Sequence, residues 1–504
     1  SRMKHRRPLA LLLAAAALGL LPAAAARGGP IDEEVNAVLR DKALSKATLG
    51  VQVLKLGTAP AQMAELYAHN SHVPLVPASN LKLVTTATAL ERLGADFKFR
   101  TRLFQRGEDL VLVGDGDPAL GDPDFPKKGT AAKPTAVFAG WAKQLRDGGL
   151  TSFRDLVVDD SVFDEAFFHP DWPADQMDAK YEAQVGGLNL NANIVDLTVS
   201  PTAHGERAQI LADPATAYLT MLNGVATGSE NAVSVSRQPG TNKVTLRGQT
   251  PARSGSKVWA TVHDPPMYAG TVLAETLERN GVRMTGQVRR DRHAKAPGDV
   301  PGGGAVASGA VASGAAVPAA AGLAGARLVA IHETPLTGVI ARANKDSVNL
   351  YAEALCKRAA YDEKRGVPGS WETGTAGMAA YLKAIGVPET DFAFVDGCGL
   401  SKRNVISPRA LARVLCYEYY GANRDAYVRS LSVAGVDGTL DDRFGRSDLR
   451  QRVFGKSGYV NGVSTLSGYF VTKAGEWHAF AIMVNRPGGL NNAEVKQLTE
   501  RIVK

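Results

Sequence analysis

The chain has 504 residues, of which 45% are hydrophobic and 21% charged, the composition of an ordinary globular protein long enough for two or three domains. Its formal charge of +8 falls to +4 when four cations are subtracted that lie in an N-terminal segment expected to be removed (Arg2, Lys4, Arg6 and Arg7). This small charge, without a basic stripe interleaved with aromatic residues, argues against nucleic acid as a partner.

The N-terminus predicts export. A basic stretch follows Met3, an apolar run occupies residues 9–21, and small residues at 23–26 end it. This order is typical of a secretory signal peptide, and the apolar run is too short for a membrane span. We therefore expect residues 1–26 to be a signal peptide and the mature protein to have no integral membrane segment. The expected location is the periplasm or the cell-wall space.

The first folded elements are predicted between residues 31 and 93. Residues 31–40 have the pattern of an amphipathic helix, residues 48–56 alternate like a strand, and residues 64–68 are expected to pair with that strand. Residues 83–93 combine good helix formers with apolar side chains at helical spacing, which predicts a helix.

The middle of the chain is predicted to be rich in strands. Residues 97–105 and 110–114 predict a hairpin. The acidic run that follows, 115–118, lacks the glycine and distal acid positions of a calcium loop, so it is expected to be a turn. Further strands are expected at 156–158, 232–236, 243–246 and 257–262, and helices at 135–146 and 265–280. Residues 189–199 lead into this strand-rich stretch.

Residues 297–326 are expected to be a linker, because this Ala/Gly-rich segment has few large apolar residues that could order it. We assign the linker no role. Beyond it, helices are predicted at 350–360, 375–384, 408–419 and 494–503, and strands at 465–472 and 478–484.

The three cysteines, Cys356, Cys398 and Cys416, are an odd number for an exported protein, so at least one must be a free thiol or pair with another chain. The sequence does not choose a disulfide pair. No metal site or cofactor is predicted, because the nine histidines lack the paired spacing of zinc motifs.

Ser79 and Lys82 are the first candidate catalytic residues. They lie at the start of the helix predicted at 83–93, three residues apart and therefore on one face. A lysine whose pKa is lowered by burial or by a neighbouring cation can remove the serine proton, and the helix N-terminus favours a developing oxyanion. The alternative is an ordinary helix cap followed by a solvated lysine, since Ser-x-x-Lys arises by chance about once or twice in such a chain.

Two further triads follow in chain order. Ser347-Val348-Asn349 precedes a predicted helix, and Lys456-Ser457-Gly458 lies where a strand is expected to start. Each triad alone has the composition of a common turn or cap. Together with Ser79 and Lys82 they form the set of motifs used by penicillin-binding proteins and serine β-lactamases.

Longer runs make the resemblance specific. Residues 114–120, 157–164, 189–191, 344–349, 396–401, 433–440 and 462–469 accompany the three motifs. From about residue 50 to the C-terminus, the chain resembles D-alanyl-D-alanine carboxypeptidases/endopeptidases of the penicillin-binding protein 4 type, which are low-molecular-mass class C penicillin-binding proteins. Two departures from that pattern are Ser457 in place of a threonine and Cys398 in place of a serine.

The resemblance implies an α+β fold of the serine β-lactamase/DD-peptidase type, an antiparallel sheet flanked by helices and interrupted by two nested β-rich domains. The implied divisions are a DD-peptidase domain at 27–96 and 327–504, an inserted domain at 97–187 and 263–296, and a second, nested domain at 188–262. The wide gap between Lys82 and Ser347 is consistent with such an insertion.

The resemblance also implies roles for the motif residues. Ser79 would attack a D-Ala-D-Ala stem peptide of peptidoglycan, with Lys82 as base, and β-lactam antibiotics would acylate the same serine. The remaining implied residues are Ser347 for proton relay, Asn349 to hold Lys82 and a substrate amide, Lys456 as a second cation that binds the substrate carboxylate, and Ser457, Gly458 and Tyr459 for substrate binding, with the Tyr459 N–H in the oxyanion hole.

Two rival functions stay open. A serine β-lactamase shares the three motifs, but its chain would be shorter and would need a group that deacylates the enzyme. A peptidoglycan-binding protein with a relic site would not require all five catalytic candidates. The sequence also leaves open a homodimer and the preference for carboxypeptidase over endopeptidase activity.

Overall fold

The computed structural model describes residues 30–126, 132–292, 325–445, 447–486 and 491–504. The predicted signal peptide and nearly all of the predicted linker therefore lie outside the described residues. The chain divides into two units: the first comprises Ser1–Phe97, Leu336–Ala359 and Trp371–Lys504, and the second Lys98–Pro335 and Ala360–Ser370. The second unit thus interrupts the sequence of the first.

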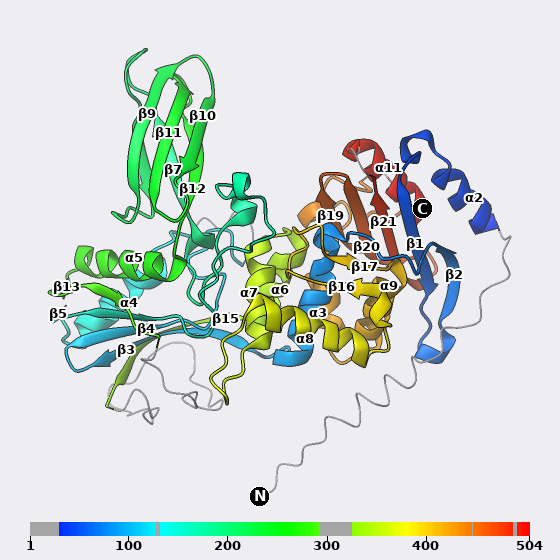
Figure 1. The fold of residues 1–504 in the computed structure, drawn as a ribbon, viewed down its shortest axis with the longest axis horizontal. Coiled ribbons are helices and arrows are strands. Elements are labelled where there is room, and N and C mark those ends of the chain that lie inside the picture. Colours follow the sequence, from blue (N-terminus) through cyan, green and yellow to red (C-terminus); the bar gives the residue numbers. More distant parts are fainter. Residues whose placement is uncertain (1–29, 127–131, 293–324, 446, 487–490) are drawn as a thin grey trace, which may run out of the picture. The chain divides into compact units, whose positions relative to one another are not determined.

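A six-stranded antiparallel sheet forms the centre of the first unit (Figure 1). Strands β1 and β21 pair from Thr48↔Asn485 to Lys55↔His478, so the N-terminal and C-terminal parts of the chain share one sheet. Strands β20 and β21 are buried over most of their length, which requires cover on both faces. In spatial order the strands are β18 (Ser432–Val433), β19 (Val453–Val460), β20 (Val463–Val471), β21 (Trp477–Asn485), β1 (Thr48–Lys55) and β2 (Ala64–His69).

Helices cover both faces of this sheet. On one face α2 (Pro30–Leu39) and α11 (Asn492–Val503) share an apolar core with β1, β20 and β21. On the other face α9 (Pro408–Tyr420) packs against β1, β20 and β21. The remaining helices of this unit are α3 (Lys82–Leu93), α6 (Leu336–Lys345), α7 (Asn349–Ala360), α8 (Trp371–Ala384) and α10 (Arg424–Ser430), and β16 (Phe392–Ala393) pairs with β17 (Val405–Ile406).

The second unit contains a mixed five-stranded sheet. Parallel pairs join β14, β6 and β4, whereas β3 is antiparallel to both of its neighbours. In spatial order the strands are β14 (Val288–Arg290), β6 (Leu156–Asp159), β4 (Asp109–Val113), β3 (Lys98–Arg106) and β15 (Arg327–Pro335). Helices α4 (Ala136–Asp147) and α5 (Pro265–Arg279) pack against one another, and β13 (Arg283–Met284) pairs with β5 (Ser152–Phe153).

Two three-stranded sheets occupy residues 194–261 of the same unit (Figure 1). They belong to one continuous apolar core with α4, α5 and the mixed sheet. The first sheet has the order β10 (Ala232–Arg237), β11 (Lys243–Pro251), β9 (Thr220–Gly228), and the second β12 (Ser256–Thr261), β7 (Ile194–Ser200), β8 (Gln209–Asp213).

The structure confirms the expected fold class and the helices and strands predicted from periodicity. Several predicted boundaries are wrong. The strand expected to start at Lys456 begins at Val453, because Val453 and Phe454 already pair with β20. The helix expected at 375–384 begins at Trp371, and the strand expected at 243–246 extends to Pro251. Helices α6 and α10 and strands β5, β8, β9 and β13 to β18 were not predicted. Among the described residues, no helix has the length and apolar content that a membrane span needs.

Candidate active site

Ser79 and Lys82 lie at the junction of a 3-10 turn, Ala78–Leu81, and helix α3. The turn begins with Ala78 at φ 45°, a left-handed backbone that is uncommon outside glycine. The buried side chains of α3 fix this helix in the core, while Ser79 is only half-buried. The hydroxyl is therefore held rigidly but stays reachable from outside.

Lys82 is fully buried and lies beside the serine. Its Nζ is 2.9 Å from Ser79 Oγ, 2.7 Å from Asn349 Oδ1 and 3.0 Å from the Cys398 carbonyl oxygen. Burial lowers the pKa of Lys82, and the nearby acidic groups Cys398, Glu353 and Asp396 oppose that fall. Burial therefore raises the neutral fraction of this amine above that of a solvent-exposed lysine.

The second triad lies in the turn between α6 and α7. Ser347 has a φ of 60°, a strained conformation for a serine, and Asn349 is the first residue of α7. This geometry brings the Asn349 amide to Lys82 and the Ser347 hydroxyl to Lys456. The turn consequently contacts both lysines of the site.

The third triad lies inside strand β19. Lys456 is fully buried, and its Nζ donates to Ser347 Oγ (2.9 Å) and to the Ser457 carbonyl (2.6 Å). Burial lowers the pKa of Lys456 strongly, the charge of Lys82 lowers it further, and Asp346 opposes the fall. Because repulsion between two cations is mutual, Lys456 also disfavours charge on Lys82.

Backbone atoms of β19 touch the turn that carries the serine. A Cβ at Gly458 would lie 2.3 Å from Thr465 Oγ1 and 2.9 Å from the backbone nitrogen of Ser79. Only glycine fits there without displacing one of these groups. Tyr459, the next residue, has an exposed side chain (52%).

A tight loop, residues 396–401, completes the surroundings of Lys82. Its Cys398 carbonyl accepts from Lys82, and a Cβ at Gly399 would lie 1.9 Å from the Ala78 carbonyl oxygen. Asp396 accepts the N–H groups of Gly399 (2.7 Å) and Ser401 (2.8 Å) and so closes the loop. The loop thus packs directly on the turn that carries Ser79.

The sequence motifs did not identify three further residues that contact the candidate site. Thr439 accepts a hydrogen bond from Ser457 (2.8 Å), Thr465 donates to the Pro77 carbonyl (2.9 Å), and Glu353 accepts from the Cys398 N–H (2.7 Å). Thr439 and Thr465 lie in runs that support the family resemblance, 433–440 and 462–469, whereas Glu353 lies in none of these runs.

Three potential metal-ligating side chains lie together near Lys82. Among the described residues, Glu353, Asp396 and Cys398 form one buried group whose potential ligand atoms lie within 4.8 Å of one another. The carboxylates of Glu353 and Asp396 already accept several N–H groups each, so they are arranged to hold peptide backbone. Cys356, Cys398 and Cys416 are all free, buried thiols.

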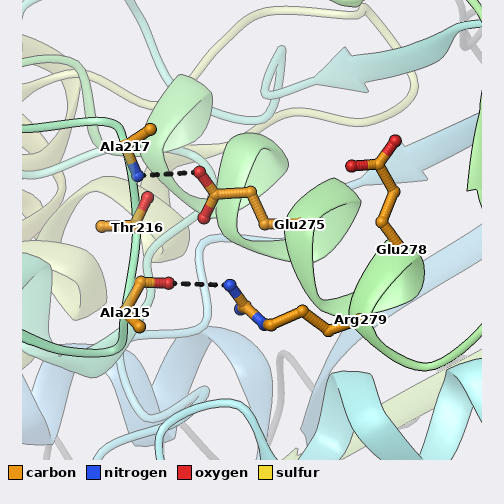
Figure 2. A pocket seen from close by; sticks show the side chains of 6 residues that line it. All are labelled: Ala215, Thr216, Ala217, Glu275, Glu278 and Arg279. Carbon is orange, nitrogen blue, oxygen red and sulfur yellow. Dashed lines mark hydrogen bonds between the residues drawn. The ribbon is translucent and has the colours of Figure 1, made fainter.

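A separate cleft of about 350 Å³ lies in the second unit (Figure 2). Glu275 accepts from the Ala217 N–H (2.8 Å), and Arg279 donates to the Ala215 carbonyl (3.1 Å) across it. None of the predicted site residues lines this cleft. The structure therefore offers no reason to connect it with Ser79.

The chain matches known proteins over nearly its whole length. The model of the D-Ala-D-Ala carboxypeptidase 3 (S13) family covers residues 31–300 and 303–504. A D-alanyl-D-alanine carboxypeptidase from Actinomadura sp. (strain R39) is 31% identical over 96% of this chain and 85% of its own length. The carboxypeptidase DacB from Haemophilus influenzae is 24% identical over 86% of this chain and 84% of its own length.

A solved structure shows the same fold. The crystal structure of penicillin-binding protein 4 (dacB) from Haemophilus influenzae superimposes with a TM-score of 0.72 at 22% identity, over 93% of this chain and 98% of that one. The family match and the Actinomadura relative both extend far beyond the three short motifs. The chain therefore belongs to the D-Ala-D-Ala carboxypeptidase 3 (S13) family of serine-type peptidases.

Proposed function

We propose that Ser79 attacks the peptide carbonyl between the last two residues of a chain ending in D-Ala-D-Ala. The attack would form an ester between Ser79 Oγ and the penultimate residue and release D-alanine. The observation that carries this proposal is the 2.9 Å separation of Ser79 Oγ from the buried Nζ of Lys82. A hydroxyl becomes an effective nucleophile when an adjacent neutral amine accepts its proton.

Lys82 is the proposed general base. Burial lowers its pKa, which increases the fraction of neutral amine at working pH, and the two acceptors on its other side orient the nitrogen. As the Oγ–carbon bond forms, the hydroxyl proton passes to Lys82 Nζ. The carbonyl oxygen then becomes an oxyanion that needs hydrogen-bond donors.

The backbone N–H groups of Ser79 and Tyr459 are the proposed oxyanion hole. The close approach of Gly458 to the Ser79 nitrogen supports this assignment, because it brings the backbone of β19 beside the nucleophile. Two preorganised donors of this kind stabilise the charged intermediate more than the neutral substrate.

Ser347 and Lys456 would deliver the proton that the leaving amine requires. Two observations support a relay from Lys82 through Ser347 to the departing nitrogen. Ser347 accepts a hydrogen bond from Lys456, and the α6–α7 turn, which carries Ser347 and Asn349, contacts both lysines. The C–N bond then breaks and neutral D-alanine amine leaves. A water molecule would afterwards hydrolyse the ester and regenerate Ser79.

Ser457, with Lys456 behind it, is the proposed contact for the terminal carboxylate of the substrate. The Ser457 hydroxyl is half-buried and already directed to Thr439, so the two hydroxyls form a small polar site beside the strand. A carboxylate arriving there would favour the charged form of Lys456. Asn349 would hold a substrate amide as well as Lys82.

The natural substrate is proposed to be the stem peptide of peptidoglycan, reached after export to the periplasm or cell-wall space. The basis is the family and the apolar N-terminal segment of the sequence. Cleavage of cross-links would be the endopeptidase form of the same chemistry. β-Lactams are proposed to acylate Ser79; the support is that the Haemophilus protein has been solved in complex with a β-lactam (TM-score 0.68).

The test uses the mature protein and its Ser79→Ala variant, each incubated with benzylpenicillin and, separately, with an N-blocked peptide ending in D-Ala-D-Ala. Intact mass should show one penicilloyl adduct on the wild type alone, and D-alanine should appear only with the wild type. Rapid turnover of penicillin without peptide cleavage would favour a β-lactamase. An adduct on neither folded protein would favour a relic site.

A further inference from the structure

Helix α7 reaches Lys82 by two routes. Asn349, at its first position, accepts directly from Lys82 Nζ (2.7 Å). Glu353 lies four residues later, on the same face of the helix, and is fully buried. Glu353 accepts a hydrogen bond from the Cys398 N–H, and the Cys398 carbonyl in turn accepts one from Lys82.

The Glu353 carboxylate accepts several donors. The N–H groups of Gly397 (2.9 Å) and Cys398 (2.7 Å) point at its two oxygens, and the indole N–H of Trp371 reaches it at 2.7 Å. Cys398 thus donates its N–H to Glu353, and its carbonyl oxygen accepts from Lys82. A displacement of this carboxylate would move the carbonyl that orients the proposed base.

The fit around the loop leaves little room for such movement. A Cβ at Gly397 would lie 2.6 Å from Cys356 Cβ and 3.1 Å from a Glu353 oxygen. On the other side, Gly399 packs against the Ala78 carbonyl, next to Ser79. The loop is therefore clamped between α7 and the turn that carries the nucleophile, and its position sets the distance from Lys82 to Ser79.

We propose that Glu353 is a positioning residue of the acylation reaction: through the 397–398 backbone it fixes the carbonyl that holds Lys82 beside Ser79. The inference rests on the proposed role of Lys82 as base. The Asp396 carboxylate also closes the loop, by accepting the N–H groups of Gly399 and Ser401, so loop structure does not depend on Glu353 alone. The distinct contribution of Glu353 is the connection from the loop to α7.

Glu353 also influences the protonation state of Lys82. When ionised it favours the ammonium form, and burial, followed by the charge of Asp396, raises the pKa of Glu353 itself to about 7. Its other titratable or charged neighbours are Lys82 on α3, Cys398 on the loop, and Cys356 and Lys357 on α7. The Lys357 ammonium lies over the Trp371 ring. Removing the Glu353 charge should therefore lower the pKa of Lys82.

The experiment compares Glu353→Gln with Glu418→Gln, measuring the acylation rate constant and the dissociation constant for benzylpenicillin from pH 5 to pH 9. Glu418 is a matched control, because it is a fully buried glutamate of the same unit that accepts from Tyr381 (2.9 Å) and not from the loop. Thermal midpoints of all three proteins are recorded in parallel.

For Glu353→Gln we expect acylation to slow about 10- to 100-fold with little change in the dissociation constant, as for a base misplaced by a fraction of an ångström. The acid limb of its rate profile should move to lower pH, which a merely structural defect would not produce. Glu418→Gln should retain the wild-type profile. Equal acylation in the two variants, or loss of rate only in proportion to unfolded protein, would overturn the proposal.

If Glu353→Gln does not fold, Trp371→Phe removes one donor to the carboxylate and should slow acylation severalfold in the same direction; an unchanged rate would overturn the proposal. The wild type separates this outcome from failure of the proposed function. If the wild type forms no adduct on Ser79, the acyl-enzyme mechanism itself is wrong. If it forms the adduct and Glu353→Gln does so equally fast, only the positioning role is wrong.

Discussion

Two serine–lysine pairs lie side by side in the site and look alike. Ser79 Oγ is 2.9 Å from Lys82 Nζ, and Ser347 Oγ is 2.9 Å from Lys456 Nζ. Both lysines are fully buried, and burial is the largest cause of the lowered pKa in each. Distance and burial alone therefore do not say which serine attacks the substrate.

The surroundings of the two pairs differ. Ser79 lies at the start of α3 with the backbone of Gly458 packed against its nitrogen, whereas Ser347 lies in the turn before α7. The lowered pKa of Lys82 is opposed by three acidic neighbours, and that of Lys456 by Asp346. The backbone of β19 lies against the Ser79 nitrogen, where an oxyanion can be stabilised, so the first pair suits attack and the second suits proton relay.

Replacing each serine by alanine in turn gives the sharpest test of this comparison. Ser79→Ala should abolish the penicilloyl adduct, because it removes the hydroxyl that is proposed to form the ester. Ser347→Ala should still form the adduct on Ser79, more slowly by a factor of about 10² to 10⁴ for loss of a proton-transfer group. Intact mass and peptide mapping distinguish the two results, and a label on Ser347 in Ser79→Ala would reverse the assignment.

Removing the proposed base should have the next largest effect. Lys82→Ala leaves Ser79 without a proton acceptor, so acylation should slow by about 10² to 10⁴ while non-covalent binding of the β-lactam persists. Stopped-flow acylation kinetics separate the rate constant from the dissociation constant. An increase in the dissociation constant alone would show that Lys82 binds the substrate and is not the base.

The contact between β19 and the Ser79 turn can be disturbed at a single atom. Gly458→Ala places a methyl group 2.9 Å from the Ser79 nitrogen and should separate the proposed oxyanion donors, slowing acylation by about 10². Gly140→Ala on α4 is the control, because a Cβ there has no neighbour within 4 Å. Equal acylation by both variants would rule out a role for the close approach of β19.

These tests also show what the sequence could and could not reveal. Residue types at short spacing, such as Ser79 with Lys82, can be interpreted from helical periodicity and chemistry. The contact between Ser457 and Thr439, and that of Glu353 with Cys398, depend on how α7, β19 and two loops pack. Local pattern carries no information on such pairs, because the residues are far apart in the chain and each is ordinary in its own segment.

The same reasoning explains the elements that were missed or misplaced. Helix α6 has apolar side chains at helical spacing but directly follows β15, so the change of periodicity at Pro335 obscures both elements. Strand β19 starts before the Lys456 motif because pairing with β20, and not the motif, sets its length. The fold class was predictable because the family resemblance spans most of the chain.

The effect of Lys456 on the pKa of Lys82 should also be visible in the pH profile of acylation. Lys456→Ala removes a neighbouring cation, so the pKa of Lys82 should rise and the neutral base should appear only at higher pH. The acid limb of the acylation profile is expected to move to higher pH, opposite in direction to the shift in Glu353→Gln. A shift in the same direction in both variants would contradict the assigned charges.

The smallest effect concerns stability, at a buried acid outside the reaction. Burial, followed by the charge of Glu91, raises the pKa of Glu418 from 4.5 to about 8, and its Oε2 has no hydrogen-bond partner. The folded protein therefore holds a proton that the unfolded chain releases above pH 4.5. The contribution to the free energy of unfolding is complete below that pH, falls by about 1.4 kcal/mol per unit above it, and is lost once the pH passes about 8.

Glu418→Gln stays neutral at every pH, so its thermal midpoint should fall less than that of the wild type between pH 6 and pH 9. Calorimetry of both proteins, with penicillin acylation followed at each pH, tests this expectation. Parallel decline of the two midpoints would show that Glu418 does not titrate in this range. A change in acylation would mean that the acid, although it lies apart from both serine–lysine pairs, is coupled to one of them.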